Sequence, residues 1–213
     1  MIEKIINEYL KEQRDKPYVS SGKFNVSDAG RCHLMRFWKR KAEKVKADFD
    51  ERAYRIFEVG HIFHGFIQDI LGKKGDLLAR ELRVEDEHRA GIIDAIVQSN
   101  GKVILYDFKT VHSRKFFWIK KEADLHYHYQ AATYTSMVKV KPTGFSIDET
   151  RICYISKDDL LIKEVPVFIT DKQLVADWNP LIAAWTTNTE PEKNPMSWEC
   201  KYCNYIAHCK EKP

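Results

Sequence analysis

The sequence predicts an α/β fold, in which helices flank a central sheet. Two strand-like runs, 91–98 and 102–109, are joined by Ser99-Asn100-Gly101, and Asn-Gly between β-branched runs is typical of a hairpin because both residues tolerate positive φ. Further strand-like runs alternate with segments whose apolar residues recur at helical spacing. Strands are expected over 77–87, 91–98, 102–109, 151–156 and 160–168, and helices over 2–13, 51–72, 120–139 and 170–187, with another that Ser27-Asp28 would cap.

The composition is typical of a single cytoplasmic domain, residues 1–213. A chain of 213 residues that is 44% hydrophobic can bury a core of its own. No apolar run approaches the roughly 20 residues of a membrane span, and the N-terminus lacks the core of a signal peptide. A net charge of +4 is a weak indication of a polyanionic partner.

The hairpin is expected to carry a small charged cluster. Asp94 interrupts its first strand, and Asp107 and Lys109 flank Phe108 near the end of its second. Residues two apart share a face of a strand, so Asp107 and Lys109 point the same way and Phe108 points to the other side. Carboxylates are ligands that Mg²⁺ and Mn²⁺ prefer, which makes this a candidate metal site. The simpler alternative is an ion pair at a strand end.

Two of the expected helices present polar residues that suit a site. On the helix over 51–72, His64 lies at the edge of the apolar stripe and His61 lies nearly opposite it. On the helix over 120–139, Gln130 and Tyr134 are one turn apart on one face. A purely structural role is the alternative for each. The stripe on the first helix consists of Ile56, Val59, Phe63, Ile67 and Ile70.

Two segments mix basic and aromatic residues and are candidate contacts for a nucleic acid. One follows Cys32 and runs to Lys46, and the other is 114–121. Cations bind phosphates and aromatic rings stack on bases. The alternatives are a solvated basic face for the first segment and inward packing of Phe116 or Phe117 for the second. The candidate contacts are Arg36, Lys39, Arg40, Arg114, Lys115 and Trp118.

The C-terminal run Cys200-x2-Cys203-x5-Cys209 predicts a metal centre. Of the two remaining cysteines, Cys153 lies in mid-strand among apolar residues, so Cys32 is the expected fourth ligand. Four thiolates suit either zinc or an iron–sulfur cluster, whereas ligation by His33 or His208 would favour zinc. The centre would join segments 27–50 and 188–213 into a metal-cluster subdomain.

The order of these motifs resembles a known family. His64, Asp94, Asp107-Phe108-Lys109 and Gln130-x3-Tyr134, enclosed by Cys32 and the three C-terminal cysteines, are similar to the PD-(D/E)XK nucleases. The resemblance is narrower to the RecB-like exonucleases with an iron–sulfur cluster, namely the CRISPR-adaptation exonucleases and the nuclease domain of the AddB helicase subunit. It covers roughly residues 27–209. Ile93 stands where the family name has Pro, and the second acid is Asp107 rather than Glu.

The resemblance implies a restriction-endonuclease-like mixed sheet and a set of site roles. His64, Asp94, Asp107 and the Phe108 carbonyl would bind Mn²⁺ or Mg²⁺, and the histidine would favour Mn²⁺. Lys109 would act on the attacking hydroxide or the phosphate, with Gln130 and Tyr134 positioning one or the other. The four cysteines would hold a structural [4Fe–4S] cluster.

The resemblance also implies a function: exonuclease action on single-stranded DNA ends, from 5′ to 3′. One alternative is a single-strand or flap endonuclease that uses the same site. Another is a catalytically idle DNA-binding subunit. Partners in CRISPR adaptation, such as an integrase, or helicase subunits in DNA repair would fit such a family member, and the oligomeric state is left open.

Overall fold

The computed structural model describes residues 1–14, 21–41, 50–119, 123–140 and 144–210. Its centre is a six-stranded mixed sheet. In the order of the sheet, β3 pairs antiparallel with β4, β4 pairs parallel with β5, and β5 pairs antiparallel with β6, while β2 and β1 also pair with β3. The strands are β1 (Phe24–Asn25), β2 (Leu77–Glu85), β3 (Arg89–Ser99), β4 (Lys102–Val111), β5 (Glu149–Ser156) and β6 (Ile162–Pro166).

The predicted hairpin is confirmed. Ser99 pairs with Lys102, and Asn100 and Gly101 take φ of 51° and 76° in the turn between them. Such values are the ones that Asn and Gly adopt at low cost, so the turn fixes the register of β3 against β4.

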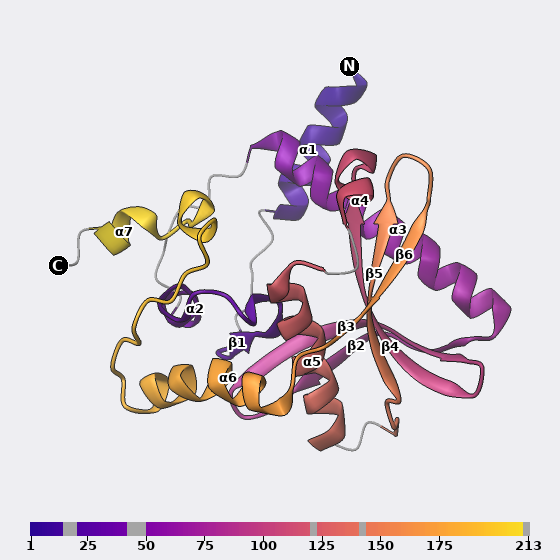
Figure 1. Ribbon diagram of the computed structural model, residues 1–213. Helices are drawn as coiled ribbons and strands as arrows, with labels where there is room; N and C mark the ends of the chain where they lie inside the picture. The colour runs from indigo at the N-terminus through magenta and orange to yellow at the C-terminus, as the bar shows by residue number, and fades with distance from the viewer. Residues whose placement is uncertain (15–20, 42–49, 120–122, 141–143, 211–213) are drawn as a thin grey trace.

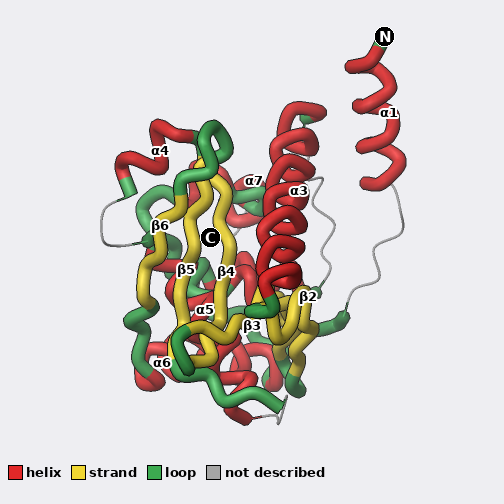
Figure 2. Tube along the Cα trace, turned by 90° about the vertical axis from the view of Figure 1, so that its right-hand side faces the viewer, coloured by secondary structure: helices red, strands yellow, loops and turns green. Residues whose placement is uncertain are grey.

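Helices cover both faces of the sheet (Figures 1 and 2). The long helix α3 (Glu51–Lys74) lies on one face and α5 (Leu125–Val140) on the other, with α6 (Asp171–Thr186) and α2 (His33–Arg40) beyond α5. The helix α1 (Ile2–Arg14) lies beside α3, away from the sheet. The short elements are α4 (Ser113–Trp118), α7 (Ile206–Lys210), and the 3₁₀ turns η1 (Val26–Asp28) and η2 (Glu199–Tyr202). No helix within the described ranges is both long and apolar enough to cross a membrane.

The predicted start of the second helix is wrong. Ser27 and Asp28 lie in η1, and α2 begins after Cys32 without a side-chain cap. The carboxylate of Asp28 is buried and bonds instead to Lys39 Nζ at 2.6 Å, so it is not available as a cap. The sequence analysis also missed β1, whose two residues pair in parallel with the start of β3. The later part of the predicted basic segment, 42–49, lies outside the described residues.

The apolar stripe predicted on α3 is correct only in part. Phe63 and Ile67 pack against a buried layer that contains Phe108 and Cys153, as expected for a small apolar cysteine. Ile56, Val59 and Ile70 are exposed instead. The difference arises because the row of residues that faces the sheet consists of Phe63, Ile67 and Leu71, which are four residues apart.

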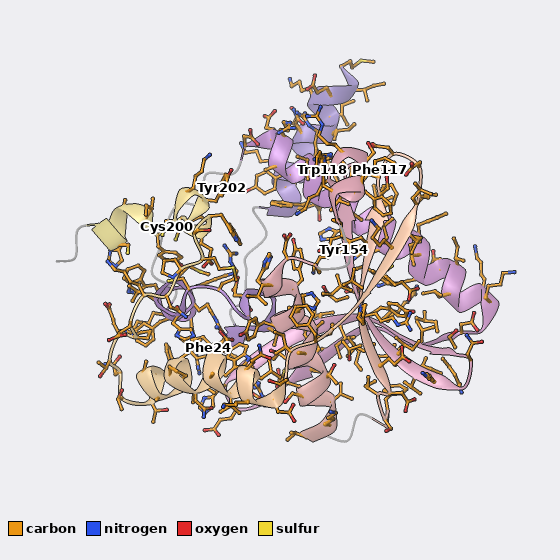
Figure 3. All side chains as sticks on the ribbon, in the orientation of Figure 1. Phe24, Phe117, Trp118, Tyr154, Cys200 and Tyr202 are labelled. Atoms are coloured by element: carbon orange, nitrogen blue, oxygen red, sulfur yellow. The ribbon has the colours of Figure 1, made fainter. Side chains whose placement is uncertain are left out.

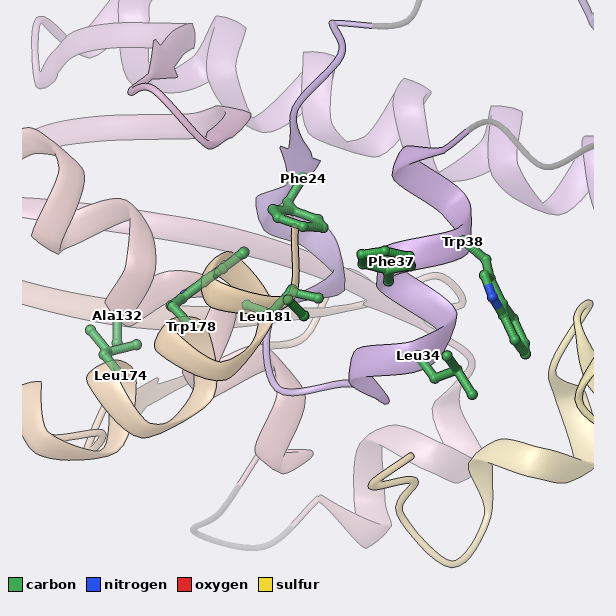
Figure 4. Packing of buried hydrophobic residues seen from close by; sticks show 10 residues of the cluster. Phe24, Leu34, Phe37, Trp38, Ala132, Leu174, Trp178 and Leu181 are labelled. Atoms are coloured by element: carbon green, nitrogen blue, oxygen red, sulfur yellow. The ribbon is translucent and has the colours of Figure 1, made fainter. Parts of the chain in front are cut away.

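A second core forms between α2 and α6, away from the sheet. Phe24, Phe37, Trp38 and Trp178 are its large side chains. Figure 4 shows Phe24, Phe37 and Trp178 in the region between these helices, whereas Trp38 lies on the other side of α2, toward the C-terminal segment. Glu190 accepts a hydrogen bond from Trp38 Nε1 at 2.9 Å, which extends this packing to the segment after α6. The core therefore joins a segment near the N-terminus to the last third of the chain.

A buried ion pair lies inside this core, and it corrects the prediction that Arg36 contacts a nucleic acid. Arg36 is 2% exposed, donates to Asp177 at 2.9 and 3.0 Å, and stacks on Trp178 at 4.0 Å. Burial raises the pKa of Asp177, but hydrogen bonds from His33 and the charge of Arg36 outweigh this and hold that pKa below its usual value. Arg36 is therefore a structural residue.

Replacing Asp177→Asn is expected to destabilise the protein by about 3 kcal/mol, because it leaves the Arg36 guanidinium buried without a counter-charge. Urea unfolding followed by circular dichroism measures the change. The matched control is Asp171→Asn at the exposed start of the same helix, which should cost much less. Equal stability of the two variants would contradict a structural role for the pair.

Candidate active site

Asp94 lies where β3 and β4 separate. The ladder between these strands runs from Ser99–Lys102 to Ala95–Tyr106. Beyond it, Asp94 Oδ2 accepts a hydrogen bond from the backbone N–H of Phe108 at 2.6 Å. A side-chain oxygen thus takes the place of the next ladder carbonyl, which holds the carboxylate at the opening between the strands.

Asp107, Lys109 and Gln130 form a closed network at this opening. Asp107 Oδ2 lies 2.8 Å from Lys109 Nζ, and Asp107 Oδ1 accepts from Gln130 Nε2 at 2.9 Å. Lys109 Nζ also donates to Gln130 Oε1 at 3.2 Å. The shared face of Asp107 and Lys109, predicted from spacing, and the contact of Lys109 with Gln130, which the resemblance implies, are both present. Asp107 is 2% exposed, so the network is largely shielded from water.

The buried charges in the network shift each other's pKa values. Burial raises the pKa of Asp107 to about 6, and the Asp94 carboxylate adds to the rise while Lys109 opposes it. Burial lowers the pKa of Lys109, but the Asp107 and Asp94 carboxylates outweigh burial and leave it above its ordinary value. Two carboxylates around one ammonium leave a local excess of negative charge, which favours a bound cation.

His64 and Phe108 complete the set of candidate metal donors. His64 Nδ1 lies 3.6 Å from Asp94 Oδ1, and its ring meets that of Phe108 at a centroid distance of 5.6 Å. Within the described ranges, no three His, Cys, Asp or Glu side chains already converge as a bound metal ion requires. Two carboxylates, an imidazole and a backbone carbonyl nevertheless match the donors of Mg²⁺ or Mn²⁺, and Asp107 is the buried carboxylate whose charge such an ion would offset.

Tyr134 positions α5 against the sheet. Its ring lies so close to Gly91 that a Cβ there would stand 2.7 Å from Tyr134 Cε1, so Gly91 is required for the close approach. Burial raises the pKa of the Tyr134 hydroxyl, and the Asp107 and Asp94 carboxylates add to the rise. Tyr134 lies one turn beyond Gln130 on α5, so its packing at Gly91 helps to place Gln130 beside Asp107.

The sequence analysis missed two residues that contact the network. Lys109 Nζ lies 4.6 Å from the ring of Tyr127, and Gln68 Nε2 donates to the backbone carbonyl of Asp94 at 2.9 Å. The signal for both was helical spacing, because Tyr127 precedes Gln130 by three residues and Gln68 follows His64 by four.

The four predicted cysteine ligands border the same cavity, although within the described ranges no three of them converge closely enough to form a metal site. Cys32, Cys200, Cys203 and Cys209 line one small cavity of about 40 Å³. All four are free thiols. Burial raises the pKa of Cys203, and the other three cysteines contribute to the rise. The spacing argument that selected Cys32 over Cys153 agrees with this arrangement.

Hydrogen bonds at this cavity join the segment around Cys32 to the segment around Glu199. The buried Glu199 carboxylate accepts from the backbone N–H of Cys32 at 3.2 Å, from that of Met196 at 2.9 Å, and from Arg31 Nε at 3.0 Å. The alternative ligands face other partners: His33 Nε2 lies 3.5 Å from Asp177 Oδ1, and the His208 ring packs on Trp38. The arrangement favours thiolates over histidines as ligands.

The second basic-aromatic segment contributes residues 114–118 to α4, directly after the strand that carries Lys109, and its residues 120 and 121 lie outside the described residues. Phe116 packs inward, while Phe117 and Trp118 are 69% and 76% exposed. At the start of the helix, Asp158 accepts a hydrogen bond from the backbone N–H of Ser113 at 2.8 Å. At its other end, Lys163 Nζ donates to the carbonyls of Phe116 and Ile119. The helix is therefore braced at both ends while it presents two aromatic rings to solvent (Figure 3).

The other basic residues of the predicted nucleic-acid contacts have partners within the protein. Lys39 binds Asp28, and Arg40 stacks on Trp185 at 3.9 Å and donates to the carbonyl of Gly22. These contacts favour the structural alternative for the first basic segment. Lys115 pairs with Asp124 at 2.9 Å near the start of α5, and Arg114 is exposed.

The fold is shared with solved structures. The chain is similar to the protein SSO0001, with 19% identity over 100% of this chain and 98% of that one and a TM-score of 0.63. Two further similarities are weaker and carry no argument. They are to a protein assigned as an exonuclease from Eubacterium rectale (14% identity, 92% and 100% coverage, TM-score 0.49) and to an alkaline exonuclease from Laribacter hongkongensis (12% identity, 90% and 94% coverage, TM-score 0.43). No curated protein sequence gives a significant match.

The family assignment comes from the sequence itself. The model of the PD-(D/E)XK nuclease superfamily matches residues 89–210, which is more than half of the chain. The matched range contains Asp94, Asp107, Lys109, Gln130 and Tyr134, the residues that the fold brings together at the end of the β3–β4 ladder. The chain belongs to the PD-(D/E)XK nuclease superfamily.

Proposed function

We propose that this nuclease is a metal-dependent DNA exonuclease that acts on single-stranded ends, from 5′ to 3′. The observation that carries the proposal is the network of Asp107, Lys109 and Gln130 beside Asp94 and His64. An oxygen-rich pocket with an adjacent ammonium suits hydrolysis of a phosphodiester, whose reacting group is an anion.

The roles follow from the positions of the donors. Asp94, Asp107, His64 and the Phe108 carbonyl would hold Mn²⁺ or Mg²⁺, which when bound activates water and offsets phosphate charge. Lys109, whose pKa the Asp107 and Asp94 carboxylates raise, would donate hydrogen bonds to the phosphate. Gln130 orients both Asp107 and Lys109, and Tyr134 lies one turn beyond Gln130 on α5.

The preference for single strands rests on α4. An exposed Trp118 on a braced helix, next to Arg114 and Lys115, offers a base-stacking surface on α4, which begins two residues after β4 ends. Stacking on an aromatic ring needs an unpaired base. The same surface would serve a single-strand endonuclease. The two activities differ in whether the substrate needs a free end.

A linear oligonucleotide and a closed single-stranded circle test the function. With Mn²⁺, the protein should shorten the linear strand from its 5′ end and leave the circle intact. Asp107→Asn, which keeps the side-chain size, should lower the rate by at least about a hundredfold, and Lys109→Ala by a similar factor. Asp171→Asn is the control. Cleavage of the circle would support an endonuclease instead, and full activity of Asp107→Asn would refute the active site.

Trp118→Ala should weaken binding of a single-stranded oligonucleotide by about 1–3 kcal/mol, because one stacked base is lost. Fluorescence anisotropy in EDTA measures the affinity without cleavage. Tyr9→Ala removes another exposed aromatic, from α1, and should leave the affinity unchanged. Unchanged affinity of Trp118→Ala would exclude stacking on this helix.

The four-cysteine cavity is proposed to hold a structural [4Fe–4S] cluster. Anaerobically purified protein should be brown and contain about four iron and four sulfide ions per chain. Cys32→Ser should be colourless and aggregation-prone, because it removes the ligand that comes from the N-terminal segment. Cys153→Ser, on β5, should keep its colour. Colourless wild-type protein with one zinc per chain would show that the metal is zinc.

A further inference from the structure

Gln68 joins α3 to the sheet next to Asp94. It is the only fully buried residue of α3, a helix that is described over its whole length. Its Nε2 group makes two hydrogen bonds, one to the carbonyl oxygen of Asp94 at 2.9 Å and one to Glu81 Oε1 at 2.7 Å. Both amide protons are therefore used, one on β3 and one on β2.

Glu81 reaches Gln68 only through an unusual backbone conformation. It lies in the middle of β2 with φ of +46°, a region that non-glycine residues rarely adopt. Arg80 pairs with Ala95 and Leu82 pairs with Ile93, so Glu81 stands opposite Asp94 in the sheet. A strained residue inside a regular strand persists only where its surroundings enforce it, and such residues gather at functional sites.

The contacts of Gln68 and His64 act on the same residue. The two side chains are one turn apart on α3, and they meet the backbone carbonyl and the carboxylate of Asp94 respectively. Together with the apolar packing of Phe63 and Ile67, these polar contacts fix where α3 lies on the sheet. A shift of α3 would change the distance between His64 Nδ1 and Asp94 Oδ1.

We propose that Glu81 and Gln68 are positioning residues for the divalent metal ion. Glu81 holds the amide of Gln68, Gln68 holds the Asp94 backbone, and together they set the separation of His64 and Asp94. The inference rests on the proposed function, because it assumes that His64 and Asp94 bind the metal. Partners that orient metal ligands typically change metal affinity by about 10–100-fold when they are removed.

The test is the affinity for Mn²⁺ without DNA, measured by titration calorimetry and by the electron paramagnetic resonance signal of free Mn²⁺. Glu81→Ala and Gln68→Leu should each weaken binding by about tenfold or more. Glu81→Gln keeps an oxygen that accepts from Gln68, so it should bind Mn²⁺ nearly as tightly as the wild type. Glu85→Ala removes an exposed glutamate from the same strand, where it pairs with Lys23 and Arg83, and should have no effect.

Thermal unfolding separates positioning from simple stabilisation. Glycine adopts φ of +46° without strain, so Glu81→Gly should melt at or above the temperature of Glu81→Ala and yet bind Mn²⁺ as weakly. Affinity that follows melting temperature across the variants would overturn the proposal. So would wild-type affinity of Glu81→Ala, or a Glu81→Gln variant as weak as Glu81→Ala.

Failure of the inference and failure of the proposed function give different results. If Asp107→Asn loses both Mn²⁺ binding and cleavage while Glu81→Ala binds normally, only the positioning role is wrong. If Asp107→Asn keeps both, the metal site itself has been assigned to the wrong residues.

Discussion

The separation of β3 from β4 at Asp94 is the constraint on which the site depends. The antiparallel ladder ends at Ala95–Tyr106, and the Asp94 carboxylate satisfies the N–H of Phe108 that the ladder leaves open. From there β4 continues beside β5, in parallel register from Ile104 to Val111. The strand that carries Asp107 and Lys109 is thus held on its β5 side and open on its β3 side, which is where a metal ion and a phosphate can enter.

The helices on both faces of the sheet supply polar partners for the charged residues at this opening. Asp107 is buried, and a buried carboxylate is stable only when it is paired and hydrogen-bonded. Lys109 and Gln130 supply those bonds from β4 and α5, while Tyr134 holds α5 against the strand at Gly91. The opposite helix, α3, brings His64 and Gln68 to Asp94. In addition to their apolar packing, α5 and α3 therefore each make polar contacts with a charged residue of the sheet.

The cysteine cavity and the core beneath it form a second centre of organisation. The Arg36–Asp177 pair, the packing of Trp38 and the bonds of Glu199 join residues that are far apart in the sequence. A metal bound by the four cysteines would add one more link between the segment around Cys32 and the C-terminal segment. Protein contacts also hold these segments together, through the Glu199 bonds and the packing of Trp38.

The central hairpin of the sheet, the main helices, the shared face of Asp107 and Lys109 and the set of four cysteines could be predicted from the sequence. These features depend on short-range periodicity, on turn chemistry and on ligand spacing, all of which can be read along the chain. Glu81 shows the opposite case, since its positive φ and its bond to Gln68 arise from the docking of α3 on β2 and β3. The same holds for Arg36, which is basic in a basic segment but is buried because α6 places Asp177 beside it. These two roles could be seen only in the folded chain. The burial and pairing of Arg36 depend on Asp177, which is more than a hundred positions away in the sequence. The conformation of Glu81 depends on the contact between α3 and the sheet.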